Sequence, residues 1–222
     1  MSEEHLLSVA RTARYLTFGN PVSETTEQIW VACHGYGQNV GRFINKFDQL
    51  DPSKHRVIAP EGLSRFYWSR DPLLIGASWM TKEKRLTEID DYCNFLDTVY
   101  DREVEPFRAS FQGSINFFGF SQGCATVCRW MHARQPHFNR LILWAGQTPE
   151  DISYAPLKEY LSQKDQWFIY GTEDEFLTKK RLVWQTNFAK DQGFQLQIKT
   201  FEGPHAIHRP TLQNLVSQWE KA

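Results

Sequence analysis

The sequence has almost no net charge, because its 25 lysines and arginines are matched by 26 aspartates and glutamates. It therefore lacks the basic field that attracts nucleic acid or anionic lipid, and neither partner is expected. No apolar run approaches the roughly 20 residues that are needed to cross a bilayer. The N-terminus opens with acids and lacks the positive region and apolar stretch of a signal peptide. These absences predict a cytoplasmic protein with no membrane span.

Cysteine is also sparse, and no C-x-x-C pair is present. The four cysteines are Cys33, Cys93, Cys124 and Cys128. Two lie in apolar segments and the other two are one helical turn apart, so we expect four buried, reduced thiols. No cluster of metal ligands is evident, because His205 and His208 stand three residues apart without further Asp or His ligands nearby. No metal and no cofactor is expected.

Repeats, low-complexity tracts and linkers are missing, and 222 residues suit one domain spanning 1–222. What the sequence does contain is an alternation of short apolar segments with segments of helical periodicity. Strands are expected at 28–34, 55–62, 114–120, 140–146, 165–171 and 194–201, and helices at 43–50, 82–100, 124–131, 176–191 and 212–219. This alternation favours a mostly parallel central sheet with helices on both faces and no large lid domain.

Three segments at the edges of this pattern are less regular. Residues 6–18 are interpreted as an antiparallel edge strand that can form a hairpin. The C-terminal helix can pack either on the sheet or at a dimer interface. Residues 63–81 are aromatic but follow no regular period, and a long loop in a compact domain is more often functional than idle. We expect this loop to wall or cover a substrate pocket, with the candidate residues Trp68, Ser78, Trp79 and Met80.

The most informative stretch is the apolar run at 114–120, which ends in Gly119-Phe120-Ser121-Gln122-Gly123. A strand, then Gly-x-Ser-x-Gly, then a helix is the context of a nucleophile elbow, whereas the five-residue pattern alone can arise by chance. Glycines on both sides relieve crowding at the sharp turn. The helix that follows directs backbone N–H groups toward the space above Ser121. Ser121 is therefore the predicted nucleophile.

A serine nucleophile needs a base and an acid that orients the base. Asp174 is the predicted acid because it lies in the loop after the strand at 165–171, although a helix N-cap is an alternative role. Among seven histidines, we prefer His205 as the base, since it follows the last strand immediately after Gly203-Pro204. His208 is interpreted as a surface or helix-entry residue, and His34 as a brace for the glycine-rich loop after the strand at 28–34.

Acyl transfer also needs an oxyanion hole, in which each donor contributes about 3–4 kcal/mol. One donor is expected to be the backbone N–H of Gln122, the residue after the nucleophile. The second is expected from the loop at 35–39. We choose the backbone N–H of Tyr36, with Gly37 as the alternative.

Taken together, these motifs resemble those of the phospholipase/carboxylesterase family of α/β-hydrolases, which includes acyl-protein thioesterases and small carboxylesterases. The resemblance covers about residues 28–208 and rests on motifs in the family's order and spacing: His34-Gly35-Tyr36-Gly37, Gly119-Phe120-Ser121-Gln122-Gly123, Gly171-Thr172-Glu173-Asp174 and Gly203-Pro204-His205. It implies a cofactor-free Ser121–Asp174–His205 hydrolase with oxyanion donors at Tyr36 and Gln122. Ala77-Ser78-Trp79 also resembles a segment that the family carries beside the active site.

Two departures from the family pattern concern the substrate. Pro204 stands directly before His205, and Met80-Thr81 follows Ser78-Trp79 where thioesterases commonly have Phe-Asp. The sequence therefore predicts a serine hydrolase of carboxylic esters with small to medium acyl chains. An acyl-protein thioesterase or lysophospholipase acting on long chains is the alternative, and a non-catalytic ligand-binding protein on the same scaffold is a remote one. A small-molecule ester or thioester is the expected partner, and the chain is expected to be a monomer or homodimer.

Overall fold

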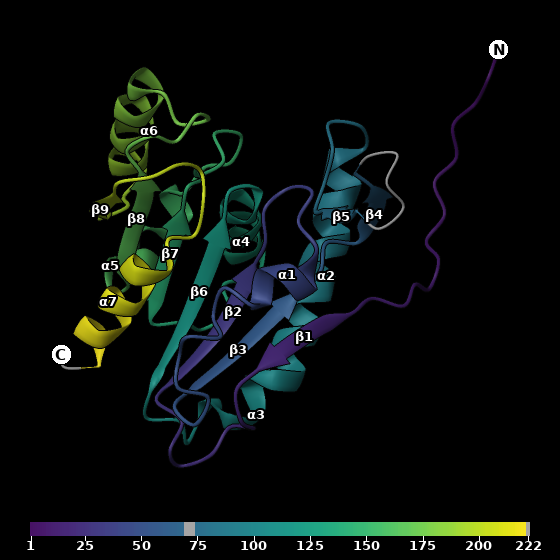
Figure 1. Cartoon of the computed structure of the whole chain (residues 1–222). Coiled ribbons are helices and arrows are strands. Elements are labelled where there is room, and N and C mark those ends of the chain that lie inside the picture. The colour runs from purple at the N-terminus through teal and green to yellow at the C-terminus, as the bar shows by residue number, and fades with distance from the viewer. Residues whose placement is uncertain (69–73, 221–222) are drawn as a thin grey trace.

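A computed structural model describes residues 1–68 and 74–220 of the chain. Its centre is a seven-stranded sheet in the order β1-β3-β2-β6-β7-β8-β9 (Figure 1). The strands are β1 (Tyr15–Phe18), β2 (Gln28–Cys33), β3 (His55–Pro60), β6 (Ser114–Phe120), β7 (Arg140–Trp144), β8 (Asp165–Gly171) and β9 (Gln197–Phe201). All neighbours pair in parallel except β1, which runs antiparallel to β3 at the edge. The predicted mostly parallel sheet is confirmed.

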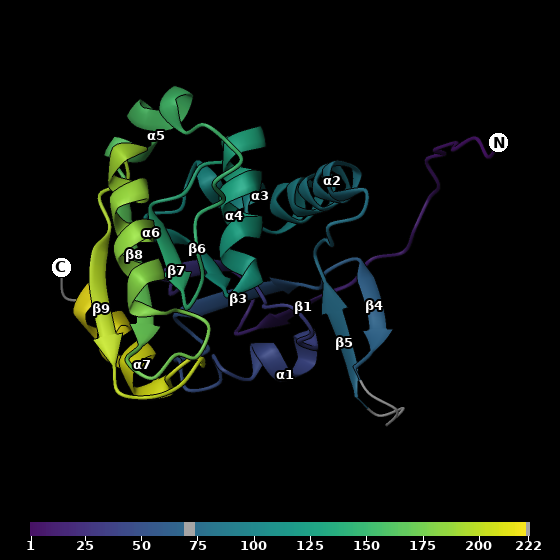
Figure 2. The ribbon, with the colours of Figure 1, turned by 90° about the horizontal axis from the view of Figure 1, so that it is seen from above.

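Helices cover both faces of this sheet, also as predicted. They are α1 (Val40–Ile44), α2 (Arg85–Glu103), α3 (Glu105–Arg108), α4 (Gln122–Arg134), α5 (Lys158–Ser162), α6 (Lys179–Asp191) and α7 (Arg209–Trp219), with a 3-10 turn, η1 (Ala155–Leu157), before α5. Figure 2 shows α2, α4 and α6 on one side of the sheet and α1 and α7 on the other. The buried residues of these two groups of helices belong to two separate apolar clusters.

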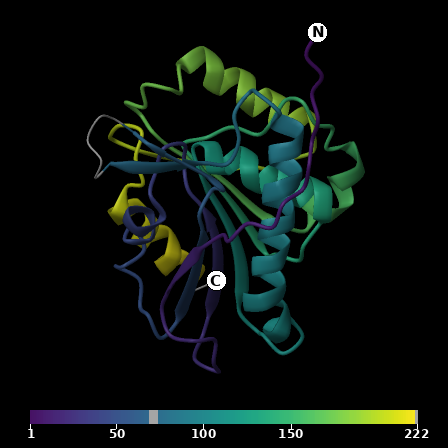
Figure 3. The same cartoon turned by 90° about the vertical axis from the view of Figure 1, so that its right-hand side faces the viewer.

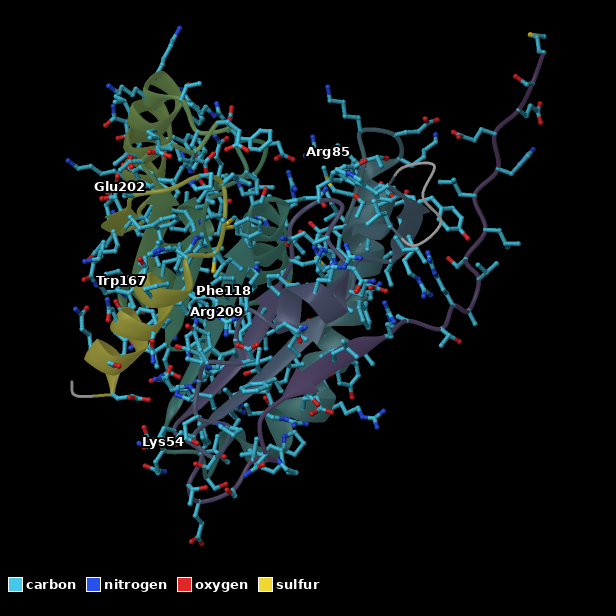
Figure 4. The ribbon with its side chains drawn as sticks, viewed as in Figure 1. Lys54, Arg85, Phe118, Trp167, Glu202 and Arg209 are labelled. Atoms are coloured by element: carbon cyan, nitrogen blue, oxygen red, sulfur yellow. The ribbon has the colours of Figure 1, made fainter. Side chains whose placement is uncertain are left out.

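Strand β6 explains how one apolar run serves both clusters. Phe117 stacks on Trp130 of α4, with ring centroids 4.6 Å apart. Phe118, labelled in Figure 4, faces the other side and packs edge-on against Phe47 at 5.3 Å. Alternate side chains of a strand point to opposite faces, so a strand that is covered on both faces is apolar throughout. Complete burial of each ring contributes about 1.5–3 kcal/mol.

The C-terminal helix α7 packs on the sheet, which is one of the two arrangements expected for it. Leu212, Leu215 and Val216 are buried and belong to the same cluster as Trp30 of β2 and Trp144 of β7. His208 is the residue that precedes the helix. Because α7 follows His208 directly, its packing also fixes the position of the loop after β9.

The prediction of a long edge strand or hairpin at residues 6–18 is wrong for most of that segment. Only Tyr15–Phe18 pairs with β3. The side chains of Leu6, Leu7 and Val9 are exposed, and Figure 3 shows the chain passing outside the helical layer toward the N-terminus. Strand β3 ends at Pro60, the partner of Tyr15, so it offers no further residue for the segment before Tyr15 to pair with.

The expected irregular loop at 63–81 is instead largely a β-hairpin. Strands β4 (Ser64–Tyr67) and β5 (Ile75–Ser78) pair antiparallel, while residues 69–73 of this segment lie outside the described part of the chain. The hairpin is attached to the loop after β2, because the backbone N–H of Gly37 donates to the Ala77 carbonyl at 2.8 Å. No helix of the described part of the chain is long and apolar enough to cross a membrane.

Candidate active site

Ser121 forms the turn between β6 and α4 with backbone angles of φ 54° and ψ −116°. This region is sparsely populated for a residue with a Cβ and costs on the order of 1–3 kcal/mol. A backbone hydrogen bond to the neighbouring strand β7 holds the turn in place, since the Ser121 N–H donates to the carbonyl of Trp144 at 2.9 Å. Strained backbone of this kind occurs where the surrounding structure fixes a functional side chain. The predicted strand–turn–helix context of Ser121 is confirmed.

The two glycines of the elbow are needed for close packing. A Cβ on Gly119 would lie 2.5 Å from the carbonyl oxygen of Gly123. A Cβ on Gly123 would lie 2.1 Å from the carbonyl oxygen of Cys33, at the end of β2. Both distances are far below van der Waals contact, so α4 starts in direct contact with the sheet only because these residues lack a Cβ. The role that the sequence predicts for both glycines is confirmed.

Asp174 lies in the loop that follows β8, and its carboxylate is buried. Oδ1 accepts hydrogen bonds from the backbone N–H groups of Phe176 and Leu177, at 2.9 and 3.1 Å. Oδ2 lies 2.7 Å from Nδ1 of His205. The N-cap of helix α6 is Thr178, not Asp174. Asp174 therefore fixes its own loop with one oxygen and holds the imidazole with the other.

His205 lies in the loop after β9, with its ring held between two aromatic side chains. The ring centroid is 5.0 Å from that of Phe120 and 4.8 Å from that of Phe176. Phe120 directly precedes Ser121, so the fold brings the predicted base to the elbow. Among the described residues, no hydrogen bond joins the Ser121 hydroxyl to the ring. The Asp174–His205 pair is thus formed, and its connection to Ser121 stays a prediction.

His34 is buried directly beneath the loop that follows β2. Its Nε2 accepts a hydrogen bond from the Gly62 N–H at 2.9 Å, so the ring proton is on Nδ1 and is donated to the Gly35 carbonyl at 2.7 Å. Burial lowers the pKa of His34 to about 4, although the bond to Gly35 and the charge of Glu61 oppose this shift. A neutral His34 therefore braces the loop, as predicted. His208 immediately precedes α7 and hydrogen-bonds Thr211 at 2.8 Å, which fits its predicted helix-entry role.

The proposed oxyanion donors lie on either side of Ser121. A Cβ on Gly35 would be 3.1 Å from Cβ of Ser121, so the loop that carries the Tyr36 N–H passes directly beside the nucleophile. The Gly37 N–H donates to Ala77 at 2.8 Å, which leaves Tyr36 as the better candidate. Gln122 is the first residue of α4, where a backbone N–H has no partner within the helix.

The side chain of Gln122 has a role that the sequence reasoning missed. Its Nε2 donates to the Met80 carbonyl at 2.8 Å, and its Oε1 accepts from the Trp79 N–H at 3.1 Å. These two bonds connect the residues after β5 to the elbow. The available signal was a long amide immediately after the nucleophile, but no spacing rule in the sequence indicates which distant backbone it binds.

The four predicted pocket residues occupy different environments. Trp79 is buried and donates from Nε1 to the His34 carbonyl at 2.8 Å, and buried Ser78 donates to the Met80 carbonyl at 2.9 Å. Both side chains therefore bind backbone near the candidate site and are not exposed to a substrate. Met80 is half-buried, whereas Trp68 is 53% exposed. A Cβ on Gly37 would overlap the Trp68 ring, so this ring lies flat on the loop after β2.

Two cavities flank the β4–β5 hairpin. One, of about 260 Å³, is lined by Trp68 and by residues 37–39 of the loop after β2. The other, of about 770 Å³, lies along α2 and the N-terminal segment and contains no residue of the predicted triad. The lining of the smaller cavity also lacks Ser121, Asp174 and His205, but this cavity borders the loop that carries Tyr36, whereas the larger one is lined by Trp79. Within residues 1–68 and 74–220, no group of three or more His, Cys, Asp or Glu side chains is arranged to hold a metal ion.

Sequence comparison finds no matching family model and no matching curated protein. Solved structures do match. Acyl-protein thioesterase 2 of Zea mays superposes with a TM-score of 0.69 at 16% identity, covering 95% of this chain and 98% of that one. A carboxylesterase of Mesorhizobium loti superposes with a TM-score of 0.65 at 17% identity, covering 88% of this chain and 88% of that one. The Bacillus cereus carboxylesterase superposes with a TM-score of 0.64 at 12% identity, covering 94% of both chains. This chain has the α/β-hydrolase fold.

In an α/β-hydrolase fold the nucleophile, acid and base follow one another along the chain at the carboxyl ends of successive strands. Ser121 follows β6, Asp174 follows β8 and His205 follows β9, which agrees with that order. At these identities the likeness to solved structures establishes the fold alone.

Proposed function

We propose that this protein is a serine hydrolase that cleaves carboxylic esters of small to medium acyl chains through an acyl-enzyme on Ser121. The observation that carries the proposal is the 2.7 Å bond between Asp174 Oδ2 and His205 Nδ1, with the imidazole ring against the residue that precedes Ser121. A buried carboxylate that holds a histidine beside a strained serine is the arrangement that nucleophilic acyl transfer needs.

The reaction follows from the roles of these groups. His205 accepts the hydroxyl proton as Ser121 attacks the ester carbonyl, and Asp174 keeps the Nδ1 proton in place and stabilises the imidazolium. Negative charge that develops on the carbonyl oxygen is stabilised by the backbone N–H groups of Tyr36 and Gln122. His205 then protonates the departing alcohol. Water, activated by the same histidine, hydrolyses the acyl-enzyme and restores the free serine.

The direct test is the Ser121→Ala variant with p-nitrophenyl acetate as substrate. We expect turnover to fall to the background rate while circular dichroism shows an unchanged fold. A fluorophosphonate probe is expected to label the wild type at Ser121 and to leave the variant unlabelled. A folded Ser121→Ala protein with undiminished turnover would overturn the proposal.

A second function, hydrolysis of long acyl thioesters or lysophospholipids, is favoured by apolar surface beside the oxyanion loop. Tyr36 packs against Phe66 and Trp68 with ring centroids 5.4 and 5.6 Å apart, and Tyr36 and Trp68 are about half exposed. One of the similar structures is an acyl-protein thioesterase. Rates on acetyl, octanoyl and palmitoyl esters and thioesters distinguish the two functions, since only a long-chain enzyme accelerates with chain length up to palmitoyl.

A non-catalytic ligand-binding protein is the alternative from another class. It is disfavoured because Ser121, Asp174 and His205 are all present and the last two are bonded; failure of the fluorophosphonate probe to label Ser121 would favour it. We further infer a cytoplasmic location, supported by four free, buried cysteines. A small-molecule ester or thioester is the proposed partner, and the proposed state is a monomer or homodimer.

A further inference from the structure

The cavity of about 260 Å³ beside the loop after β2 is lined by positive charge only, among the described residues. It lies between α1, the loop after β2 and the β4–β5 hairpin. Its described lining includes two cationic side chains and no acidic one. The polar and aromatic lining residues are Gln38, Asn39, Arg42, Lys46 and Trp68. A concave site with charge of a single sign selects ligands of the opposite sign.

The two cations are not neutralised by acids in the part of the chain that the structure describes. Arg42 and Lys46 stand four residues apart, on α1 and the turn after it, and both are exposed. Neither takes part in an ion pair among residues 1–68 and 74–220. The acid that follows them, Asp48, pairs with Arg209 instead. Two neighbouring like charges repel each other, so an anion between them is favoured.

The two amide side chains in the lining add hydrogen-bond donors. Oε1 of Gln38 accepts from the Gly35 N–H at 2.8 Å. Oδ1 of Asn39 accepts from the Gly41 N–H at 3.0 Å, at the start of α1. Because both amide oxygens already serve the loop, the NH₂ groups are what these side chains offer to a ligand. Cations and amide donors together make a lining suited to an acceptor such as a carboxylate.

The cavity borders the loop that carries the proposed oxyanion donor Tyr36. Its wall begins at Gly37, two residues after the glycine that lies against Ser121. On the other side, the Asp48–Arg209 ion pair ties the chain just after Lys46 to the start of α7, four residues after His205. Arg209 is labelled in Figure 4, and α1 and α7 share one face of the sheet. A group bound in this cavity would therefore lie against the loop that passes beside Ser121.

We propose that this cavity is a subsite for a carboxylate carried by the substrate, so that the enzyme prefers esters with a negative charge near the scissile bond. Arg42 and Lys46 bind the carboxylate, the amides of Gln38 and Asn39 donate to it, and the flat face of Trp68 contacts the carbon chain. The inference rests on the proposed esterase function and defines its substrate class.

The experiment compares kcat/KM for charged and neutral esters in two matched pairs. On the acyl side, the pair is 4-nitrophenyl hemisuccinate and 4-nitrophenyl methyl succinate. On the alcohol side, it is 4-acetoxybenzoate and its methyl ester. The ratio of charged to neutral is measured for the wild type, for Arg42→Gln/Lys46→Gln, and for the control Lys158→Gln/Lys190→Gln. Lys158 and Lys190 adjoin Gly193 at the end of α6, away from the Asp174 loop.

We expect the wild-type ratio to exceed one in at least one pair and to fall about five- to tenfold in Arg42→Gln/Lys46→Gln, as loss of two exposed charge contacts implies. The pair that responds identifies which side of the ester carries the carboxylate. The control variant is expected to keep the wild-type ratio. Ratios that are unaffected by Arg42→Gln/Lys46→Gln in both pairs, or an equal fall in the control, overturn the subsite. Loss of Ser121-dependent hydrolysis of the neutral esters would instead refute the esterase function.

Discussion

Asp174 and His205 come from loops after two adjacent strands, β8 and β9, and meet through a single hydrogen bond of 2.7 Å between Oδ2 and Nδ1. In Asp174→Asn, the amide N–H can face the N–H at Nδ1 of His205, which breaks the bond. Alternatively, the ring changes to the tautomer with its proton on Nε2, which cannot accept a proton from Ser121. We expect kcat for p-nitrophenyl acetate to fall on the order of 10³–10⁴-fold. Glu173→Gln provides the control, because it changes neither partner of this bond, whereas the Glu175 carboxylate accepts a hydrogen bond from the His205 N–H at 3.3 Å. If Asp174→Asn retains wild-type kcat, the acid has been misassigned.

The pKa of His34 predicts a specific loss of stability in acid. Burial lowers the pKa from 6.5 to about 4 in the folded protein. Between these values the unfolded chain binds a proton that the folded chain excludes, so the free energy of unfolding decreases as the pH falls from about 6.5 to about 4. The full difference is about 3 kcal/mol, from the value per pKa unit. Urea unfolding measured at several pH values tests this.

The His34→Gln variant is the matched comparison for the acid effect. An amide offers both a donor and an acceptor to the Gly35 carbonyl and the Gly62 N–H but does not titrate. We expect the stability of this variant to depend less on pH between 6.5 and 4 than that of the wild type. Parallel curves for the two proteins would show that His34 is not the titrating group.

The four cysteines are expected to be inert in the native protein. All four are free and buried. Burial raises the pKa of each thiol, to about 12 for Cys93 and Cys128. Because the thiolate is the reactive form, a disulfide reagent such as DTNB at pH 8 is expected to react with no thiol in the folded protein and with all four in guanidinium chloride. A thiol that reacts rapidly before unfolding would contradict this burial.

The side chain of Gln122 is expected to affect catalysis through position alone. Gln122→Met keeps the length and the backbone donor but loses both bonds to residues 79 and 80. We expect the free energy of unfolding to fall by about 1–3 kcal/mol, since the Trp79 N–H loses its acceptor, while the Met80 carbonyl keeps the hydrogen bond from the Ser78 hydroxyl. We also expect kcat to fall while the pH dependence of kcat stays unchanged. Gln122→Glu retains only the oxygen that accepts from the Trp79 N–H. If this variant keeps the wild-type kcat, the effect of Gln122 depends on its hydrogen bond to Trp79.

The parts of the fold that the sequence predicted are those with strong local signals. Each central strand is an apolar run covered on both faces, and β2, β6 and β8 run directly into glycine-containing turns. The sequence predicts that the elbow, Asp174 and His205 lie near one another, because parallel strands bring their carboxyl ends to one edge of the sheet. The connection from His205 to Ser121 stays a prediction.

The features that the sequence did not predict depend on long-range contacts. The β4–β5 hairpin is exposed at alternate positions of β4, and its pairing with the loop after β2 is set by backbone hydrogen bonds. Trp79 resembles a pocket aromatic in the sequence, yet it is buried, and its indole N–H donates to the His34 carbonyl. Neither the periodicity nor the composition of the sequence indicates that the hairpin pairs with the loop after β2 or that Trp79 binds the His34 carbonyl.

The positive φ of Ser121 implies a trade-off between activity and stability. Ser121→Gly removes the Cβ that makes this conformation costly, whereas Ser121→Ala keeps it. We expect the glycine variant to melt a few degrees above the alanine variant, even after the greater freedom of its unfolded chain is counted. A glycine variant that melts below the alanine variant, by the amount that its freer unfolded chain alone accounts for, would mean that the turn carries no strain. In this fold, the nucleophilic serine lowers the stability of the turn that carries it. The inactive Ser121→Gly protein is therefore expected to be more stable than a protein with a Cβ at this position.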